Sequence, residues 1–440
     1  MKKELAIEVI KDFHEKKLPE IIKRDIEIKI PKNRKTITII GPRRAGKTYF
    51  LFNIINDLRN EIDKTEVIYI NLEDDRLLPL DPRDLDTLLR TYYEIYPENR
   101  KKKIYLFFDE IQNVPGWEHF IRRIMDTEDV QVFITGSSSK LLAKEIATSM
   151  RGRSLSYLIL PFSLKEILRI KRIDAEKYLS SDKKAWIMNT LQEYMEFGGF
   201  PEVVLEEDKN TKLRILKEYI EVMLMRDLVE RHRIKNIKIL RMLFNALLNS
   251  FSKEFSTHKF YNFLRSQGIK TSKNTLYEYI QYFEDAFAII PVRRFSYTLR
   301  EIEQSLPKIY AIDNGYIAQS GIKFSPNTGS LMENMIAVEL LRRKYINPLM
   351  EFYYWRDSSR KEVDFVIKEG SSIKQLIQSC YNIEDYNTKT REVKSLIKAG
   401  KELKCRNLHI ITWDYEATET IEGKTIVYTP LWKWLLKNNK

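Results

Sequence analysis

Residues 41–48 read Gly-Pro-Arg-Arg-Ala-Gly-Lys-Thr, two glycines separated by four residues and then Lys-Thr. The β-branched run at 36–40 predicts a buried parallel strand before this segment, and the apolar spacing at 49–60 predicts a helix after it. A glycine-rich loop between a strand and a helix N-terminus can wrap its backbone N–H groups around phosphates. The pattern predicts an α/β P-loop fold in which Lys47 contacts the outer phosphates and the Thr48 hydroxyl binds Mg²⁺. The predicted nucleotide contacts are Gly41, Pro42, Arg43, Arg44, Ala45, Gly46, Lys47, Thr48 and Tyr49.

A second apolar strand, at 103–110, ends in two carboxylates, Asp109 and Glu110. Asp109 is placed to hold Mg²⁺, and Glu110 is placed to orient or deprotonate the attacking water. A third strand at 130–134 runs into hydroxyl residues at 135 and 137–139. We select Thr135 as the residue that senses the γ-phosphate, and the choice among these hydroxyls stays open.

Several segments together resemble an AAA+ ATPase of the archaeal and bacterial group that carries a C-terminal nuclease-like domain of unknown function. This resemblance implies ATP and Mg²⁺ as cofactors and ATP hydrolysis as the reaction. It also implies an arginine finger after the third strand, for which Arg153 is the first candidate and Arg151 the second. The alternative is that one of them only pairs with a carboxylate, and action in cis or in trans stays open. The matching segments are 41–48, 70–74, 108–112, 135–138, 151–153, 160–163 and 197–201.

Composition restricts the partners and the compartment. The 440 residues predict several domains, and the net charge of +13 favours an anionic partner, nucleic acid first. No apolar run approaches the length of a membrane span. Two cysteines imply neither a disulfide framework nor a cysteine zinc site, so the chain is predicted to be cytoplasmic.

We predict four regions. Residues 1–161 hold one or two N-terminal helices and the ATPase core, and 162–230 a helical lid or linker. Residues 231–310 carry fourteen Lys and Arg against six Asp and Glu, and their helix–helix–turn–helix–strand pattern predicts a winged helix-turn-helix. Its predicted contacts with double-stranded DNA are Lys273, Asn274, Arg293 and Arg294. The alternative for this region is docking of a protein partner.

Residues 311–440 resemble the restriction-endonuclease-like α/β fold. This resemblance implies a metal site with Glu333 on a helix and Asp364 on the second strand. Where the fold carries Glu-x-Lys on its third strand, this chain has Gln378 and Cys380. Gln lacks the metal-binding charge and Cys cannot replace the ammonium, so we expect a degenerate site without DNA cleavage.

Three functions remain open after these observations. The first is an ATPase that couples hydrolysis to its hold on DNA or on a partner protein. The second is a slow-turnover nucleotide switch in signalling or defence, and an ATP-regulated DNA nuclease ranks third. A finger acting in trans would require a homo-oligomer, which the sequence does not determine.

Overall fold

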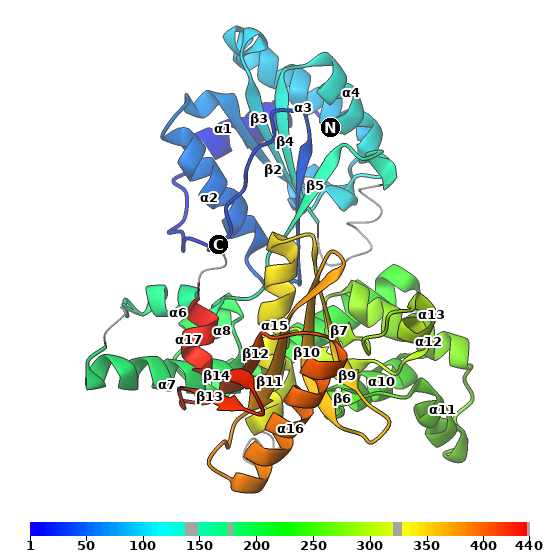
Figure 1. The fold of residues 1–440 in the computed structure, drawn as a ribbon. Coiled ribbons are helices and arrows are strands. Elements are labelled where there is room, and N and C mark those ends of the chain that lie inside the picture. Colours follow the sequence, from blue (N-terminus) through cyan, green and yellow to red (C-terminus); the bar gives the residue numbers. More distant parts are fainter. Residues whose placement is uncertain (137–147, 175–178, 320–327, 438–440) are drawn as a thin grey trace. The chain divides into compact units, whose positions relative to one another are not determined.

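The computed structural model describes residues 1–136, 148–174, 179–319 and 328–437. Its contacts divide the chain into two compact units, Met1–Leu160 and Pro161–Lys440 (Figure 1). Each unit is described by itself.

The first unit is built on a five-stranded parallel sheet with the order β2-β3-β4-β1-β5. Strands β1, β3 and β4 are almost completely buried, as expected inside a parallel sheet, whereas the edge strand β5 is partly exposed. The predicted parallel sheet with the glycine loop after β1 is therefore confirmed. The strands are β1 (Thr36–Ile40), β2 (Val67–Asn71), β3 (Ile104–Asp109), β4 (Val130–Thr135) and β5 (Ser154–Leu158), and the helices are α1 (Lys3–Glu15), α2 (Lys47–Arg59), α3 (Pro82–Ile95) and α4 (Trp117–Thr127).

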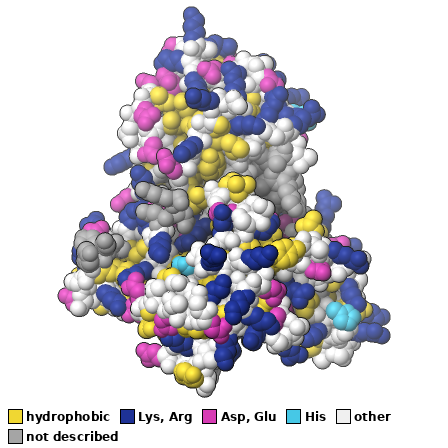
Figure 2. All heavy atoms as spheres, in the orientation of Figure 1, with side chains coloured by type: hydrophobic (Ala, Val, Ile, Leu, Met, Phe, Trp, Pro, Cys, Tyr) yellow, Lys and Arg dark blue, Asp and Glu magenta, His cyan; other side chains and the backbone are white. Residues whose placement is uncertain are grey.

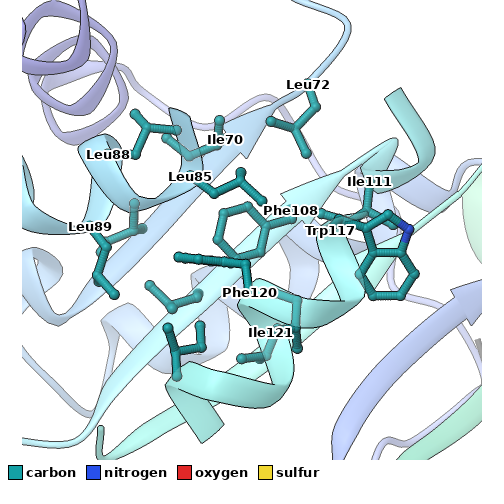
Figure 3. Close-up of a cluster of buried hydrophobic side chains, with 14 of the residues drawn as sticks. Ile70, Leu72, Leu85, Leu88, Leu89, Phe108, Ile111, Trp117, Phe120 and Ile121 are labelled. Carbon is teal, nitrogen blue, oxygen red and sulfur yellow. The ribbon is translucent and has the colours of Figure 1, made fainter. Parts of the chain in front are cut away.

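Apolar side chains fill both sides of this sheet. Figure 3 shows one side, where Ile70 of β2 and Phe108 of β3 meet Leu85 of α3 and Phe120 of α4. A second cluster lies under α2 and includes Phe50, buried to 2% exposure. The strand ends that carry the loop and the acids are therefore held by a close-packed core.

The N-terminal region forms one helix, α1, so the option of a second helix is wrong. Residues 16–35 contain no helix or strand. Ile26 and Ile28 lie partly buried against the α2 side of the core. Arg24 donates from Nη1 to the carbonyl oxygen of Ala45 at 2.9 Å, which ties this segment to the glycine loop.

The second unit combines a helical part with two sheets. A three-stranded sheet has the order β6-β8-β7, and a six-stranded mixed sheet has the order β13-β14-β12-β11-β10-β9. The helices are α6 (Leu164–Ile170), α7 (Ser181–Phe197), α8 (Pro201–Leu205), α9 (Lys209–Val222) with its π-helical extension Met223–Glu230, α10 (Ile237–Asn249), α11 (Thr257–Ser266), α12 (Lys273–Asp285), α13 (Leu299–Gln304), α14 (Asn314–Ala318), α15 (Thr328–Ile346), α16 (Tyr386–Glu402) and α17 (Leu431–Leu436). The strands are β6 (Lys253–Glu254), β7 (Ile289–Val292), β8 (Lys308–Ala311), β9 (Met350–Arg356), β10 (Glu362–Glu369), β11 (Ser372–Cys380), β12 (Leu408–Thr412), β13 (Ala417–Ile421) and β14 (Lys424–Pro430).

The structure does not separate the chain at the predicted region boundaries, residues 230 and 310. The helices of 162–230 pack within the second unit, with α6 on α17 and α7 on α14. The boundary at 310 falls inside β8, whose last residue is Ala311. Strands β9, β10 and β11 match the predicted ones, whereas the β13–β14 hairpin was not predicted.

The two glycines after α7 have a structural reason. Gly198 has φ +78°, and a Cβ there would lie 1.6 Å from Oδ1 of Asp313. The Gly199 N–H donates to Oδ2 of Asp313 at 2.8 Å, and the Gly315 N–H donates to Oδ1 at the same distance. A buried carboxylate therefore holds the α7–α8 turn against the start of α14, and this segment is structural.

Among the described residues, no helix is both long enough and apolar enough to pass through a membrane.

Candidate functional site

The glycine loop takes the shape that its sequence requires. Gly41 has φ +147°, and a Cβ at this residue would lie 2.0 Å from the carbonyl oxygen of Ile159. Gly46 has φ +90° and caps the N-terminus of α2. Neither position tolerates a side chain, since these backbone angles strain L-residues. The loop thus delivers the first backbone N–H groups of a thirteen-residue helix to one point.

Lys47 lies buried in the loop. Its Nζ donates to the carbonyl oxygens of Gly41 and Pro42, both at 3.1 Å. The outer residues of the predicted set differ in exposure: Arg43 is half-buried, and Arg44 and Tyr49 are exposed. The Lys47 ammonium therefore lies inside the loop, where a phosphate group bound by the loop would meet it.

Asp109, at the end of β3, accepts hydrogen bonds from three hydroxyl groups. Its Oδ2 accepts from Thr48 Oγ1 at 2.7 Å and from Tyr69 OH at 2.9 Å. Its Oδ1 accepts from Thr135 Oγ1. The structure thus brings together Thr48, Asp109 and Thr135, three of the residues selected from sequence.

Burial raises the pKa of Asp109, the Glu110 carboxylate adds to this, and the bond from Thr135 opposes it. The hydroxyl groups of Thr48, Tyr69 and Thr135 supply the hydrogen bonds that this buried carboxylate needs. Sequence analysis missed Tyr69. The sequence contained only a weak indication of this contact. Tyr69 lies two residues before Asn71 and so shares its face of β2, and Asn71 pairs with Asp109 in the parallel register.

Glu110 begins the loop after β3 with φ +56°, an unusual angle for this residue. Its N–H donates to Thr135 Oγ1 at 3.0 Å, and its Oε2 accepts from Gln112 Nε2 at 2.5 Å. The left-handed backbone turns the Glu110 side chain away from the line of the strand, next to the Asp109 site. The neighbouring serines 137–139 lie outside the described residues.

Arg151 and Arg153 do not reach the phosphate-binding loop of their own chain. Arg153 precedes β5, whose first residue pairs with Thr36 at the start of β1, while the loop follows the other end of β1. Five residues of strand separate the two ends, or about 13 Å. Arg153 instead pairs with Asp126, Nη1 to Oδ1 at 2.6 Å. Neither arginine therefore lies at the loop of its own chain in this structure, and the finger, in cis or in trans, stays a prediction.

The predicted DNA contacts divide into exposed and engaged residues. Lys273 and Asn274 lie exposed in the first turn of α12, and Arg294 is exposed after β7. Arg293 forms hydrogen bonds within the chain: its Nη1 donates to the carbonyl oxygens of Glu303 and Ser305 at 3.2 and 3.1 Å. After β7 the chain enters α13 at Leu299. Figure 2 shows Lys and Arg side chains interspersed with Asp and Glu over the visible surface.

The predicted carboxylates of the second unit also meet. Glu333 of α15 and Asp364 of β10 both accept from the ammonium of Lys308, at 3.1 and 3.2 Å. Gln378 and Cys380 are buried on β11, and burial raises the pKa of the Cys380 thiol to about 12. Sequence analysis missed Lys308, although a lysine in the short apolar run Lys-Ile-Tyr-Ala was a signal.

Comparison with known families assigns the first unit to a class. An AAA domain matches residues 33–168, which contain the glycine loop, Asp109 and the parallel sheet. This is a P-loop nucleotide-binding domain. Two domains of unknown function match the remainder, DUF8612 over residues 188–325 and DUF4143 over residues 328–434.

The chain is 44% identical to an uncharacterized protein of Methanocaldococcus jannaschii, over 99% of this chain and 96% of that protein. It belongs to the family of that archaeal protein. An uncharacterized protein of Haemophilus influenzae is 28% identical over 90% of this chain and 93% of its own length.

Two solved structures are similar to this chain at a low level. The Aeropyrum pernix ORC1 protein in complex with DNA covers 76% of this chain and 92% of its own, with a TM-score of 0.30 and 12% identity. The Pyrobaculum aerophilum Cdc6p structure covers 84% of this chain and 88% of its own, with a TM-score of 0.25 and 13% identity. These values are too low to carry a functional argument.

Proposed function

We propose that the AAA domain binds ATP with Mg²⁺ and hydrolyses it. The observation that carries this proposal is the meeting of Thr48 and Asp109, whose Oγ1 and Oδ2 lie 2.7 Å apart at the N-terminus of α2. The loop, the buried Lys47 and an acid on the neighbouring strand end are the parts that phosphoryl transfer needs in one place.

Mg²⁺ fits these residues because hydroxyl and carboxylate oxygens are the ligands it prefers. Thr48 and Asp109 would hold it, and the bound ion supplies charge stabilisation on the phosphate oxygens. Tyr69 and Thr135 orient the Asp109 carboxylate through its two oxygens. Positioned partners of this kind keep a ligand in its binding geometry.

Glu110 is the proposed general base. Its carboxylate lies beside Asp109 and is bonded to the Gln112 amide. A base held by an amide has to give up that bond, or share it, when it takes a proton from water. This contact favours the second candidate function, a nucleotide switch with slow turnover, in which Gln112 keeps Glu110 from the water.

Steady-state phosphate release tests the ATPase. Glu110→Gln should lower turnover by about a hundred- to ten-thousandfold with ATP affinity retained, as for a lost general base. Glu98→Gln is the matched control, because Glu98 is an exposed acid of the same unit. Hydrolysis at the parent rate by Glu110→Gln would contradict the assignment. Faster turnover in Gln112→Ala would support the switch.

We further propose that the region of α10–α12 and β6–β8 binds double-stranded DNA as a winged helix-turn-helix. Support comes from its element order, α10-β6-α11-α12-β7-α13-β8, and its sheet order, β6-β8-β7. Exposed Lys273 and Asn274 at the start of α12 are placed where such helices contact bases or phosphates. The local excess of positive charge supports phosphate contacts.

Fluorescence anisotropy with a short duplex tests the DNA proposal. Lys273→Glu with Arg294→Glu should abolish binding, and parent affinity should fall with salt with a log–log slope of about −0.9 per phosphate contact. Arg293 is left unchanged because it holds the β7–β8 connection. The control pair Lys16→Glu and Lys17→Glu makes the same charge change at exposed lysines of the first unit. Equal affinities of the two double variants would favour docking of a protein partner instead.

A further inference from the structure

Three carboxylates of the second unit face one point. Glu333 comes from α15, and Glu362 and Asp364 share one face of β10 because they are two residues apart. We call these three residues the acid cluster. The resemblance to restriction-endonuclease-like proteins implies a divalent ion at Glu333 and Asp364. The atoms that lie between these two carboxylates therefore decide whether such an ion fits.

A lysine ammonium lies at that point. Lys308 Nζ is 2.6 Å from Oε1 of Glu362, 3.1 Å from Oε1 of Glu333 and 3.2 Å from Oδ1 of Asp364. The ammonium donates hydrogen bonds to Glu333 and Asp364 and forms an ion pair with Glu362. Burial alone would lower the pKa of Lys308, but the carboxylates, with Glu333 first, raise it well above the usual value. The ammonium therefore compensates negative charge inside the acid cluster.

Strand pairing on both sides holds the backbone of Lys308 in place. It lies on the central strand of its sheet, paired with Glu254 of β6 on one side and Val292 of β7 on the other. Its side chain is 3% exposed. Tyr310, two residues further on, donates from its hydroxyl to Oε1 of Glu333 at 2.6 Å. Displacing the ammonium would therefore require rearrangement of a paired strand.

The second oxygen and the N–H of Asp364 also have partners. Oδ2 of Asp364 accepts from the Ser379 N–H at 2.9 Å. Gln378 accepts from the Asp364 N–H at 3.2 Å and donates to Oε2 of Glu392 at 2.5 Å. In the parts of the chain that the structure describes, no three His, Cys, Asp or Glu side chains are arranged to hold a metal ion. The residues present do not fit a divalent ion.

A second ion pair links the same two sheets. Arg356 of β9 pairs with Glu254 of β6, Nη1 to Oε2 at 2.7 Å, and Tyr354 donates to Oε1 of Glu254 at 2.9 Å. Both links join the three-stranded sheet to the six-stranded sheet. The acid cluster therefore lies at a polar contact between two sheets, where charges need partners because they are removed from water.

We propose that the Lys308 ammonium is the resident cation of the acid cluster, takes the place of a divalent ion, and locks the β6-β8-β7 sheet to the β9–β14 sheet. The chain then has no metal-dependent chemistry at Glu333 and Asp364. The cluster instead connects the proposed DNA-binding region to the C-terminal domain. This inference does not depend on ATP hydrolysis or on DNA binding.

Binding of Mn²⁺ to the nucleotide-free full chain, measured by electron paramagnetic resonance, tests the proposal. The parent and Asp364→Asn should bind Mn²⁺ equally, because the cluster of the parent already holds its cation. Lys308→Met keeps the apolar stem and removes the charge, and it should gain a stoichiometric site with a Kd below about 1 mM. That gain should disappear when Asp364→Asn is added.

If Lys308→Met does not fold, Mn²⁺ binding and DNA cleavage by the parent chain still test the proposal. A Mn²⁺ site in the parent that Asp364→Asn removes would overturn it. Cleavage of supercoiled DNA with Mg²⁺ or Mn²⁺ by the parent, lost in Asp364→Asn, would also overturn it and would support the nuclease function. A folded Lys308→Met that binds no more Mn²⁺ than the parent would contradict the replacement of a metal by the ammonium.

Discussion

Asp109 in the first unit and Asp364 in the second are both buried aspartates on sheet strands, yet their bonded partners differ in charge. Asp109 accepts from the neutral hydroxyls of Thr48, Tyr69 and Thr135. Asp364 accepts from the ammonium of Lys308 and from a backbone N–H. Neutral donors leave the negative charge for an incoming cation, whereas a bonded ammonium already compensates it.

The comparison explains how two buried acid sites in one chain can have opposite roles. Hydroxyls are small and their bonds are each worth only about 1 kcal/mol net, so a bound ion and nucleotide can rearrange them. An ammonium inside three carboxylates is costly to remove, since it would leave uncompensated buried charge. We therefore expect the first site to be reactive and the second to be structural.

The largest expected difference is in ATP turnover. Asp109→Asn should reduce turnover by about a hundredfold or more, because loss of a metal ligand removes several kcal/mol of transition-state stabilisation. Asp364→Asn should leave turnover unchanged. Steady-state phosphate release under saturating Mg²⁺-ATP measures both, and equal loss in the two variants would break the comparison.

The next difference is in folding stability. Lys308→Met should lower the free energy of unfolding by about 3–5 kcal/mol, as for a broken buried ion pair. Lys212→Met is the matched control, because Lys212 is also buried but pairs with one carboxylate, Glu193, whose side chain is 39% exposed. Urea denaturation, followed by circular dichroism, should give a smaller loss for the control. A larger loss in Lys212→Met would contradict the special role of the acid cluster.

A pH dependence should distinguish the second unit from the first. Burial raises the pKa of Asp313 to about 7, against the opposing effect of the Gly199 and Gly315 N–H donors and of Arg342. The folded state then binds a proton that the unfolded state releases near pH 4, so stability falls as pH rises from about 4 to 7. The loss is a few kcal/mol, since each pH unit in this window corresponds to about 1.4 kcal/mol.

Thermal melting between pH 4 and pH 8 measures this effect. Asp313→Asn should remove the part of the pH dependence that falls in this window, whatever its effect on stability at a single pH. An unchanged slope in Asp313→Asn would assign the titration to another group.

The smallest expected effect is at the far edge of the first sheet. Arg153→Ala should leave turnover of the isolated chain unchanged, since Arg153 pairs with Asp126 at the edge opposite the loop. Stability should change by about 0–1 kcal/mol, as for an exposed ion pair. The assay is run at concentrations where light scattering gives one chain per particle. A large fall in turnover there would support a finger acting in cis.

Local patterns in the sequence predicted which residues meet at the end of the first sheet. The glycine loop and the acids at 109 and 110 each lie on one continuous segment whose strand and helix signals are strong. Parallel strands place their carboxyl ends at one edge of the sheet, so the meeting of Thr48, Asp109 and Thr135 follows from chain direction alone. The meeting of Glu333 and Asp364 was implied only by the resemblance to the restriction-endonuclease-like fold.

Strand order and register decided the rest. Arg153 lies far from the loop because β5 runs parallel to β1 and begins at its opposite end. Tyr69 reaches Asp109 because β2 pairs with β3 in a register that one residue of slip would reverse. Lys308 meets acids 25 to 56 positions away in the chain because β8 packs beside α15 and β10.

The sequence by itself determined the class of the first unit, the residues of its phosphate-binding loop and the acids that follow it. These features depend on neighbours in the chain, whose backbone preferences are local. Only the tertiary structure decided which charges meet, because electrostatic partners are set by distance in space and by burial. The acid cluster shows this most clearly: the sequence named two of its carboxylates, and the fold supplied the ammonium that keeps a metal out.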